Sequence, residues 1–189
     1  YLRGLRRLDP ALAYTGVDAY AHYIDQARAI YAEDPHARFE VRDLQRPLDL
    51  GRFDLAYCCN VLLHLPDFRA PVRHLLASAT RAVIIRTLLA AETTVVKKAI
   101  TQAFTEQGEP LDYVYKNTWQ VNYFRTFIQD LGWRTELVAD EFDPRVLHQD
   151  HQAVKRGAGT GVLDGRQVDG NVLFNWQWIV CTPPAGRDA

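Results

Sequence analysis

Two predicted strands of this chain end in an acidic side chain, and this repeated ending is the feature that most constrains the fold. The first strand spans residues 13–18 and ends at Asp18, and the second spans residues 37–43 and ends at Asp43. Short apolar runs of this kind are typical of buried parallel strands. Because open α/β sheets bind ligands beyond the carboxyl ends of their strands, the two endings indicate a binding site at that edge.

The chemistry of the two carboxylates narrows the ligand class. A carboxylate accepts hydrogen bonds from both hydroxyls of a ribose, which a hydroxyl or amide side chain does less well. Asp is also a favoured residue at helix N-termini, so Asp18 taken alone is equally consistent with a cap on the following helix. Two acidic endings together favour a nucleoside-containing ligand.

Hydrophobic periodicity and turn residues divide the chain into alternating strands and helices. The predicted helices are 1–8, 20–33, 68–79, 91–107 and 119–131, and the predicted strands are 13–18, 37–43, 53–60, 82–89, 133–139 and 171–182. Residues 141–170 carry five glycines and many charges, so we expect an irregular excursion there. We expect a single domain over residues 1–189.

The end of the chain predicts one reversed strand. No convincing crossover helix lies between residues 133–139 and the final strand, and a parallel neighbour would need such a crossover. The predicted fold class is therefore α/β, a Rossmann-like three-layer sandwich with a mostly parallel sheet and an antiparallel final strand.

Composition excludes several function classes. The formal net charge is -1 and 48% of the residues are hydrophobic, which indicates a globular protein without general attraction to nucleic acid or anionic membranes. No apolar run is long enough for a membrane span. Three cysteines, with Cys58 and Cys59 adjacent in a predicted strand, are typical of buried thiols in a reducing cytoplasm. The predicted localisation is cytoplasmic, and no oligomeric state is predicted.

The beginning of the chain reads as the interior of an amphipathic helix. Leu2 and Leu5 fall on one face, no cap precedes them, and the chain contains no methionine. We therefore expect this sequence to be a fragment whose first strand and following loop are absent.

The strongest motif is Phe53-Asp-Leu-Ala-Tyr-Cys-Cys-Asn60-Val-Leu-Leu-His64-Leu-Pro66. Together with Tyr14-Thr-Gly-Val-Asp18-Ala19 and Val41-Arg-Asp43-Leu44, it resembles the strand motifs of class I S-adenosylmethionine-dependent methyltransferases. The resemblance covers residues 1–89, the expected cofactor-binding half, and extends over 119–182 by topology.

The resemblance assigns roles to individual residues. It implies that Asp18 with Ala19 binds the ribose hydroxyls, that Asp43 with Leu44 recognises the adenine, and that Asn60 lies beside the methionine moiety. The family's glycine-rich loop has no counterpart in this sequence, and residues 1–8 resemble the helix that follows it. We therefore expect these 189 residues alone to bind the cofactor weakly.

Catalysis of methyl transfer needs alignment, exclusion of water and, for some acceptors, a general base. His64 is the histidine of the strongest motif, and its ordinary pKa suits that task. The alternative is that His64 packs or bonds to a loop without moving protons.

Acceptor binding is expected in two segments that interrupt the alternation, residues 90–118 and 141–170, because connections of this kind vary freely. Tyr115, Trp119 and Tyr123 combine flat apolar area with hydrogen-bonding tips, which suits a small-molecule or glycan acceptor; the core of a cap packed on the sheet explains them equally well. No metal site is predicted.

Two clusters of polar residues are expected to lie on solvated surfaces rather than in binding sites. Asp140, Glu141 and Asp143 are expected at a solvated strand end, and His148, Asp150 and His151 in a solvated loop.

The sequence thus predicts methyl transfer from S-adenosylmethionine to a small-molecule or glycan acceptor. The alternatives are a nicotinamide-dependent oxidoreductase, since Asp18 would also suit an adenosine ribose there, and a non-catalytic binding domain with the same fold.

Overall fold

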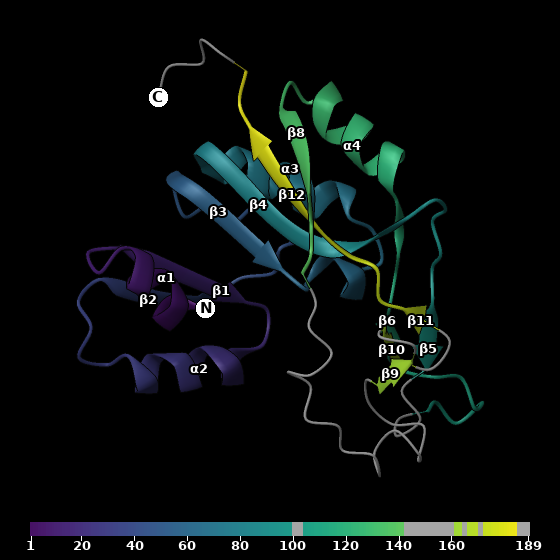
Figure 1. Cartoon of the computed structure of the whole chain (residues 1–189). Helices are drawn as coiled ribbons and strands as arrows, with labels where there is room; N and C mark the ends of the chain where they lie inside the picture. Colours follow the sequence, from purple (N-terminus) through teal and green to yellow (C-terminus); the bar gives the residue numbers. More distant parts are fainter. Residues whose placement is uncertain (100–103, 142–160, 164–165, 170–171, 185–189) are drawn as a thin grey trace. The chain divides into compact units, whose positions relative to one another are not determined.

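The computed structural model describes residues 1–99, 104–141, 161–163, 166–169 and 172–184 (Figure 1). The chain divides into two compact units, Tyr1–Gly51 and Arg52–Ala189. The boundary falls at Gly51, inside the segment that we expect to bind the cofactor. The single domain over residues 1–189 stays a prediction.

Unit 1 consists of a two-stranded parallel sheet with two helices. The strands are β1 (Tyr14–Asp18) and β2 (Ala37–Val41), and the helices are α1 (Leu2–Leu8) and α2 (Ala21–Ile30). Helix α2 contacts both strands and buries Ile24, which is 3% exposed. The register pairs Asp18 with Val41, so both strands end at the same edge of the sheet.

An aromatic ring lies over the one glycine of β1. The ring of Phe39 stacks on Tyr31 at 5.5 Å and approaches Tyr14 at 5.9 Å between centroids. A Cβ atom at Gly16 would lie only 2.8 Å from Cδ1 of Phe39. Glycine is therefore required here by close approach across the two strands rather than by a turn.

Unit 2 contains a five-stranded mixed sheet. Its order is β3 (Phe53–Cys59), β4 (Ala79–Ala90), β12 (Trp176–Thr182) and β8 (Arg134–Ala139), and β7 (Trp119–Gln120) also pairs with β4. Strands β3 and β7 run parallel to β4, whereas β12 is antiparallel to both β4 and β8. Strand β12 therefore runs against the other four, which confirms the predicted antiparallel final strand.

Helices α3 (Arg69–Ser78) and α4 (Val121–Asp130) cover one face of this sheet. The guanidinium of Arg73 on α3 lies 4.9 Å from the ring of Phe127 on α4, so the two helices touch. Beneath them Val83, Ile85 and Ile179 alternate along β4 and β12 and are fully buried. The core of unit 2 thus lies on this face of the sheet.

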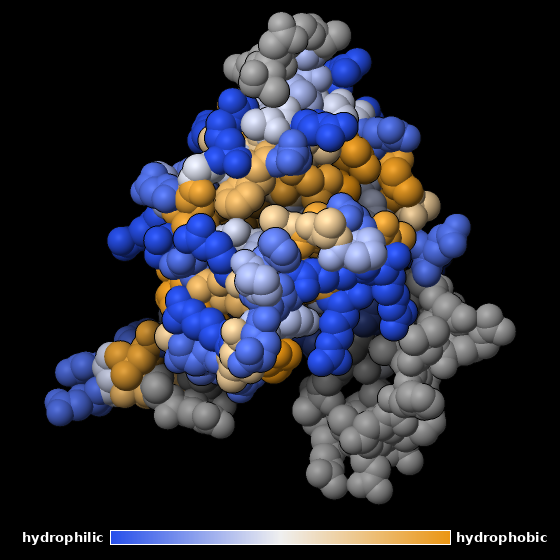
Figure 2. Space-filling model, turned by 90° about the vertical axis from the view of Figure 1, so that its left-hand side faces the viewer, coloured by the Kyte–Doolittle hydropathy of each residue, from blue (hydrophilic) through white to orange (hydrophobic). Residues whose placement is uncertain are grey.

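The opposite face of the sheet is less covered. Ile84 and Val180, which pair across β4 and β12, are only half-buried, and Leu55 of β3 and Val138 of β8 are 44% and 43% exposed. Figure 2 shows hydrophobic residues gathered at the surface and bordered by hydrophilic ones. Among the described residues of unit 2, the two longest helices therefore form one layer on one side of the sheet.

The predicted helix over 91–107 is wrong for the described residues of that range. Strand β5 (Lys97–Ala99) pairs antiparallel with β6 (Tyr113–Tyr115), and Thr94 forms an isolated bridge to Thr118. The run of threonines and valines at 93–96 loses side-chain freedom in a helix and fits an extended chain. Pairing with residues 113–118, which are distant in the sequence, therefore determines that this segment is extended.

The segment 141–170, which we expected to be irregular, contains regular strands. Strands β9 (Gly161–Leu163), β10 (Arg166–Asp169) and β11 (Val172–Leu173) form an antiparallel sheet in the order β11-β10-β9. Residues 142–160 lie outside the described residues. The predicted final strand over 171–182 is in fact two elements, because Val172–Leu173 belongs to β11.

Helices long and apolar enough to cross a membrane do not occur in the described part of the chain.

Candidate functional site

The two acidic strand endings lie in unit 1, each in a short turn. Oδ1 of Asp18 accepts a hydrogen bond from the amide of Tyr20 at 2.8 Å, and Oδ1 of Asp43 accepts one from the amide of Gln45 at 2.9 Å. The second oxygen of each carboxylate makes no hydrogen bond to the described residues. Each carboxylate is thus oriented by its own turn and retains an oxygen for a ligand.

The parallel register brings these two residues to one edge of the sheet. The amide of Arg42 donates to the carbonyl of Asp18 at 2.9 Å, so the ladder continues to the last residue of β1. Ala19 is exposed and Leu44 is half-buried beside the respective carboxylates. Asp18 is the last residue of β1, as predicted. The predicted strand over 37–43 is too long, because β2 ends at Val41 and Asp43 lies two residues beyond it, in the turn that follows.

The alternative in which Asp18 caps the following helix does not describe the structure. Helix α2 begins at Ala21 and its N-cap is Tyr20, without a side-chain cap hydrogen bond. Asp18 lies two residues before that cap and bonds the amide of the cap residue itself. Its carboxylate orients the turn between strand and helix.

Asn60 follows β3 in unit 2 with a left-handed backbone. Its φ is 61°, a conformation that Asn tolerates better than most residues. Its amide donates to the carbonyl of Arg86 at 3.0 Å, and its Oδ1 accepts from Nη1 of Arg86 at 2.7 Å. The thiol of Cys59 lies 3.5 Å from the same Oδ1. Asn60 is therefore held by Arg86 through both backbone and side chain.

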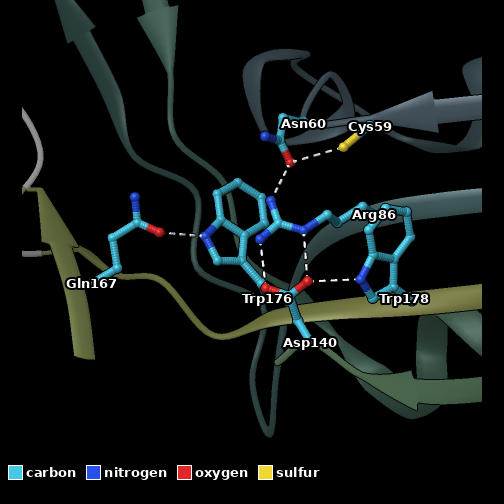
Figure 3. Close-up of polar contacts among 7 residues, drawn as sticks. All are labelled: Cys59, Asn60, Arg86, Asp140, Gln167, Trp176 and Trp178. Atoms are coloured by element: carbon cyan, nitrogen blue, oxygen red, sulfur yellow. Dashed lines mark hydrogen bonds and ion pairs between the residues drawn. The ribbon is translucent and has the colours of Figure 1, made fainter. Parts of the chain in front are cut away.

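Arg86 is the centre of a polar network that joins three strand ends (Figure 3). Its Nε and Nη2 donate to the two carboxylate oxygens of Asp140 at 2.9 and 2.5 Å. Nε1 of Trp178 donates to Oδ1 of the same carboxylate at 2.7 Å, and the guanidinium lies 4.1 Å from the ring centroid of Trp176. Bidentate pairing and stacking of this kind require arginine rather than lysine.

Burial makes this ion pair electrostatically strong. The side chains of Arg86 and Asp140 are 14% and 11% exposed. The Arg86 guanidinium, through its hydrogen bonds and its charge, lowers the pKa of the Asp140 carboxyl from its ordinary value, and the Trp178 bond acts in the same direction. Asp140 is thus a buried anion, and the expectation of a solvated strand end is wrong for this residue.

A cavity of about 630 Å³ lies beside this network, wholly within unit 2. It is bounded by the ends of β4 and β8 and by the start of β12, which is the carboxyl edge of the parallel strands. Its lining residues are Ala90, Ala91, Thr94, Val96, Lys116, Thr118, Asp140, Arg166, Gln167, Val172, Leu173, Phe174, Asn175 and Trp176. The volume suits a small molecule.

His64 ends the short 3-10 helix η1 (Leu62–His64) and its side chain is exposed. Its Nδ1 lies 3.0 Å from the carbonyl oxygen of Tyr115. Because a carbonyl only accepts, Nδ1 carries the proton and the other ring nitrogen of a neutral imidazole is left as an acceptor. The loop contact that the sequence allowed is therefore present, and it leaves one nitrogen for proton transfer.

The three aromatic candidates occupy different surroundings. Trp119 is 4% exposed and packs on Phe68 at 5.0 Å, and Tyr123 is 46% exposed and meets the same ring edge-on at 5.5 Å. Tyr115 is half-buried in β6. The burial of Trp119 agrees with its alternative as core, while an acceptor role for Tyr115, Trp119 and Tyr123 stays a prediction.

Sequence reasoning missed Arg86 and the two tryptophans around it. One signal was present, because Arg86 is a charged residue inside the apolar run 83–89, and such residues are rarely buried unless paired. Nothing local pointed to Trp176 or to Gln167, which lie far from Arg86 in the chain. His148, Asp150 and His151 lie outside the described residues, as does most of the expected insertion 141–170.

A comparison with protein families finds a match for the first part of the chain. Residues 1–84 match a family described as a methyltransferase domain. This range includes both acidic strand ends, Asn60 and His64. Among curated proteins, no sequence match was found.

Solved structures share the fold at low sequence identity. DhpI in complex with SAH matches with a TM-score of 0.54 and 15% identity over 90% of this chain and 66% of that one. The [4+2]-cyclase SpnF matches with a TM-score of 0.58, 14% identity and coverage of 98% and 71%. An S-adenosylmethionine-dependent methyltransferase from Mesorhizobium loti matches with a TM-score of 0.51, 17% identity and coverage of 90% and 80%. This chain thus spans just under two thirds of the length of DhpI.

Proposed function

We propose that this chain, whose residues 1–84 match a methyltransferase domain family, is a class I S-adenosylmethionine-dependent methyltransferase that transfers a methyl group to a small-molecule or glycan acceptor. The observation that carries the proposal is the pair of carboxylates, Asp18 and Asp43, at one edge of a parallel sheet inside that domain.

The residues present fit a nucleoside cofactor. Asp18 retains one oxygen that can accept from ribose hydroxyls, and Asp43 retains one beside the turn that would face an adenine. Ala19 and Leu44 would contribute the backbone next to each carboxylate. Asn60 would contact the methionine moiety from the end of β3, where Arg86 holds its left-handed conformation.

The bound cofactor supplies an electrophilic methyl group on a sulfonium. The chain therefore needs to align the acceptor and exclude water, and the cavity of unit 2 is the place that we propose for the acceptor. His64 is proposed to accept the acceptor's proton at the ring nitrogen that faces away from Tyr115. Tyr115, Trp119 and Tyr123 are proposed to border the acceptor. None of these four residues lines the cavity, so the acceptor would have to extend beyond it to reach them. In a methyl-transfer assay, His64→Gln should lower turnover and leave cofactor affinity unchanged.

We also propose the layered architecture that the family resemblance implies. The resemblance implies three layers and a mostly parallel sheet. The parallel pairing of β1 with β2 in unit 1 and of β3 with β4 in unit 2 supports it.

The fold by itself leaves the reaction open. A [4+2]-cyclase has a similar fold, so binding of the cofactor and transfer of its methyl group have to be measured separately. A domain that binds the cofactor without transferring its methyl group would be a binding domain.

The first test is titration of the full-length protein with S-adenosylhomocysteine. Asp18→Ala should weaken binding roughly 10- to 100-fold, because charge-assisted hydrogen bonds are lost and each factor of ten corresponds to about 1.4 kcal/mol. Asp18→Asn is the sharper variant, since its amide oxygen can still accept from the Tyr20 amide and maintain the turn while the charge is removed.

Asp25→Ala serves as the matched control in the same unit, because the Asp25 side chain is 69% exposed on α2. It should bind S-adenosylhomocysteine like the wild type. Unchanged affinity in a folded Asp18→Ala protein would remove Asp18 from the ribose site and, with it, the observation on which the proposal rests.

A further inference from the structure

The charges that line the cavity of unit 2 do not cancel. Asp140 is neutralised by Arg86, and Lys116 forms an ion pair with Asp169 of β10. Arg166, the first residue of β10, also lines the cavity and has no carboxylate partner among the described residues. Counted over the described residues alone, the lining therefore carries one positive charge without an ion-pair partner.

Two free hydrogen-bond donors of the lining lie on adjacent residues, Arg166 and Gln167. Oε1 of Gln167 accepts from Nε1 of Trp176 at 2.7 Å, which leaves the amide nitrogen of Gln167 to donate; Figure 3 shows that nitrogen pointing away from the indole. The amide nitrogen of Asn175 is already used, because it donates to the carbonyl of Leu89 at 2.6 Å. A guanidinium and an amide nitrogen on adjacent residues suit a ligand group that only accepts.

One side of the lining is apolar and flat. Phe174 and Trp176 meet edge to face at 5.4 Å, and Val96 and Val172 complete this side of the cavity. The Trp176 ring is fixed from two sides, by stacking of the Arg86 guanidinium and by its bond to Gln167. A fixed aromatic wall next to a cation suits an apolar body that ends in an anion.

We propose that the acceptor of this methyltransferase carries an anionic group, a carboxylate or a phosphate, that binds Arg166 and the amide nitrogen of Gln167 while its apolar body contacts Phe174 and Trp176. The inference rests on the proposed function, because it takes the cavity as the acceptor site. A carboxylate is also present in the cofactor, so the experiment has to separate the two sources.

Two ligands of similar shape, one anionic and one neutral, measure how much the ligand's charge contributes to binding. We would titrate the full-length protein, saturated with S-adenosylhomocysteine, with 4-hydroxybenzoate and with 4-hydroxybenzamide, which differ in charge and little in shape. The wild type should bind the benzoate about tenfold more tightly than the benzamide. In Arg166→Gln the preference should fall below about twofold, and in Arg166→Lys an intermediate preference should remain, because a lysine keeps the charge without the planar fork.

Arg81→Gln is the matched control. Arg81 is an exposed arginine near the start of β4, at the opposite end of the strand from the cavity, and its removal should leave the tenfold preference unchanged. Affinity for S-adenosylhomocysteine should be the same in the wild type, Arg166→Gln and Arg81→Gln.

Three results would overturn the inference. Equal affinity of the wild type for the two probes, or no binding of either, contradicts an anion site in the cavity. A weaker binding of S-adenosylhomocysteine in Arg166→Gln would assign the cation to the cofactor's carboxylate. Failure of the wild type to bind S-adenosylhomocysteine is a different outcome, since it contradicts the proposed function itself.

Discussion

At the scale of single residues, Arg86 joins the end of β3 to the residues that line the cavity of unit 2. It holds Asn60 at the end of β3 on one side and contacts Asp140 and Trp176, which line the cavity, on the other. The ion pair with Asp140 balances the charge of this largely buried arginine. The same guanidinium thus contacts both Asn60 and the wall of the cavity.

Asp140→Asn should destabilise the protein by about 1–3 kcal/mol, because the substitution removes the carboxylate that accepts two charge-assisted hydrogen bonds from the Arg86 guanidinium. The new amide oxygen can still accept from Trp178, so packing is little changed. Urea unfolding at neutral pH measures the loss. Asp130→Asn, an exposed position at the end of α4, is the control and should have no effect.

The same variant should change the pH dependence of stability. Since Arg86 lowers the pKa of Asp140 below its ordinary 3.8, the pair stabilises the fold fully above that value and progressively less as the pH falls toward the lowered pKa. Wild-type stability should therefore fall more steeply in acid than that of Asp140→Asn. Parallel curves for the two proteins between about pH 5 and about pH 2 would contradict the assignment of this pH dependence to Asp140.

At the scale of elements, Asn117 fixes the short helix that carries His64. Its backbone amide donates to the carbonyl of Leu63 at 2.8 Å. Its side-chain Nδ2 donates to the carbonyl of Leu65 at 2.9 Å, and its side-chain Oδ1 accepts from the backbone amide of Val96 at 3.1 Å. Asn117 is fully buried. One side chain thus joins three segments that are far apart in the sequence.

Asn117→Ala should cost about 1–3 kcal/mol, because it leaves the Val96 amide and the Leu65 carbonyl buried without their partner. Asn117→Asp keeps an acceptor for Val96 and loses the donor for Leu65, so it separates the two contributions. Hydrogen exchange of the Val96 amide reports the local effect: it should accelerate in Asn117→Ala and stay slow in Asn117→Asp. Equal exchange in both variants would mean that the Oδ1 contact does not hold this segment.

At the scale of the whole molecule, burial decides the chemistry of the three thiols. Cys58 is 4% exposed and Cys181 is fully buried, and burial raises the pKa of each to about 12. Cys59 is half-buried. Because the thiolate is the reactive form, the two buried thiols should be inert while the protein is folded.

Titration of the native protein with a disulfide reagent at pH 8 should therefore modify one thiol quickly, and titration of the unfolded protein should modify all three. Cys59→Ser should remove the fast phase. Fast reaction of two or three thiols in the native protein would show that unit 2 opens to solvent more readily than this packing allows. Stability should also decline as the pH rises from the ordinary thiol value of 9.0 toward 12, because only the unfolded chain ionises there.

Local patterns in the sequence were sufficient for the first elements of the chain and for the acidic edge. Apolar runs, turn residues and strand endings predicted β1, β2, α2 and the position of Asp18 and Asp43, because parallel strands bring their carboxyl ends to the same edge. The reversed final strand followed from the lack of a convincing crossover helix before it. Each of these depends on residues that are near one another in the chain.

Only the tertiary structure decided the rest. Residues 97–99 form a strand because residues 113–115 pair with them, and that pairing overrides the helical period of the sequence. Arg86, Asp140, Trp176 and Gln167 make one network although they are dispersed from residue 86 to residue 176, and hydrogen bonds and stacking across strands have no sequence period. The edge that holds the carboxylates was thus readable from the chain, whereas the cavity and its unbalanced charge arise from which strand ends pack together.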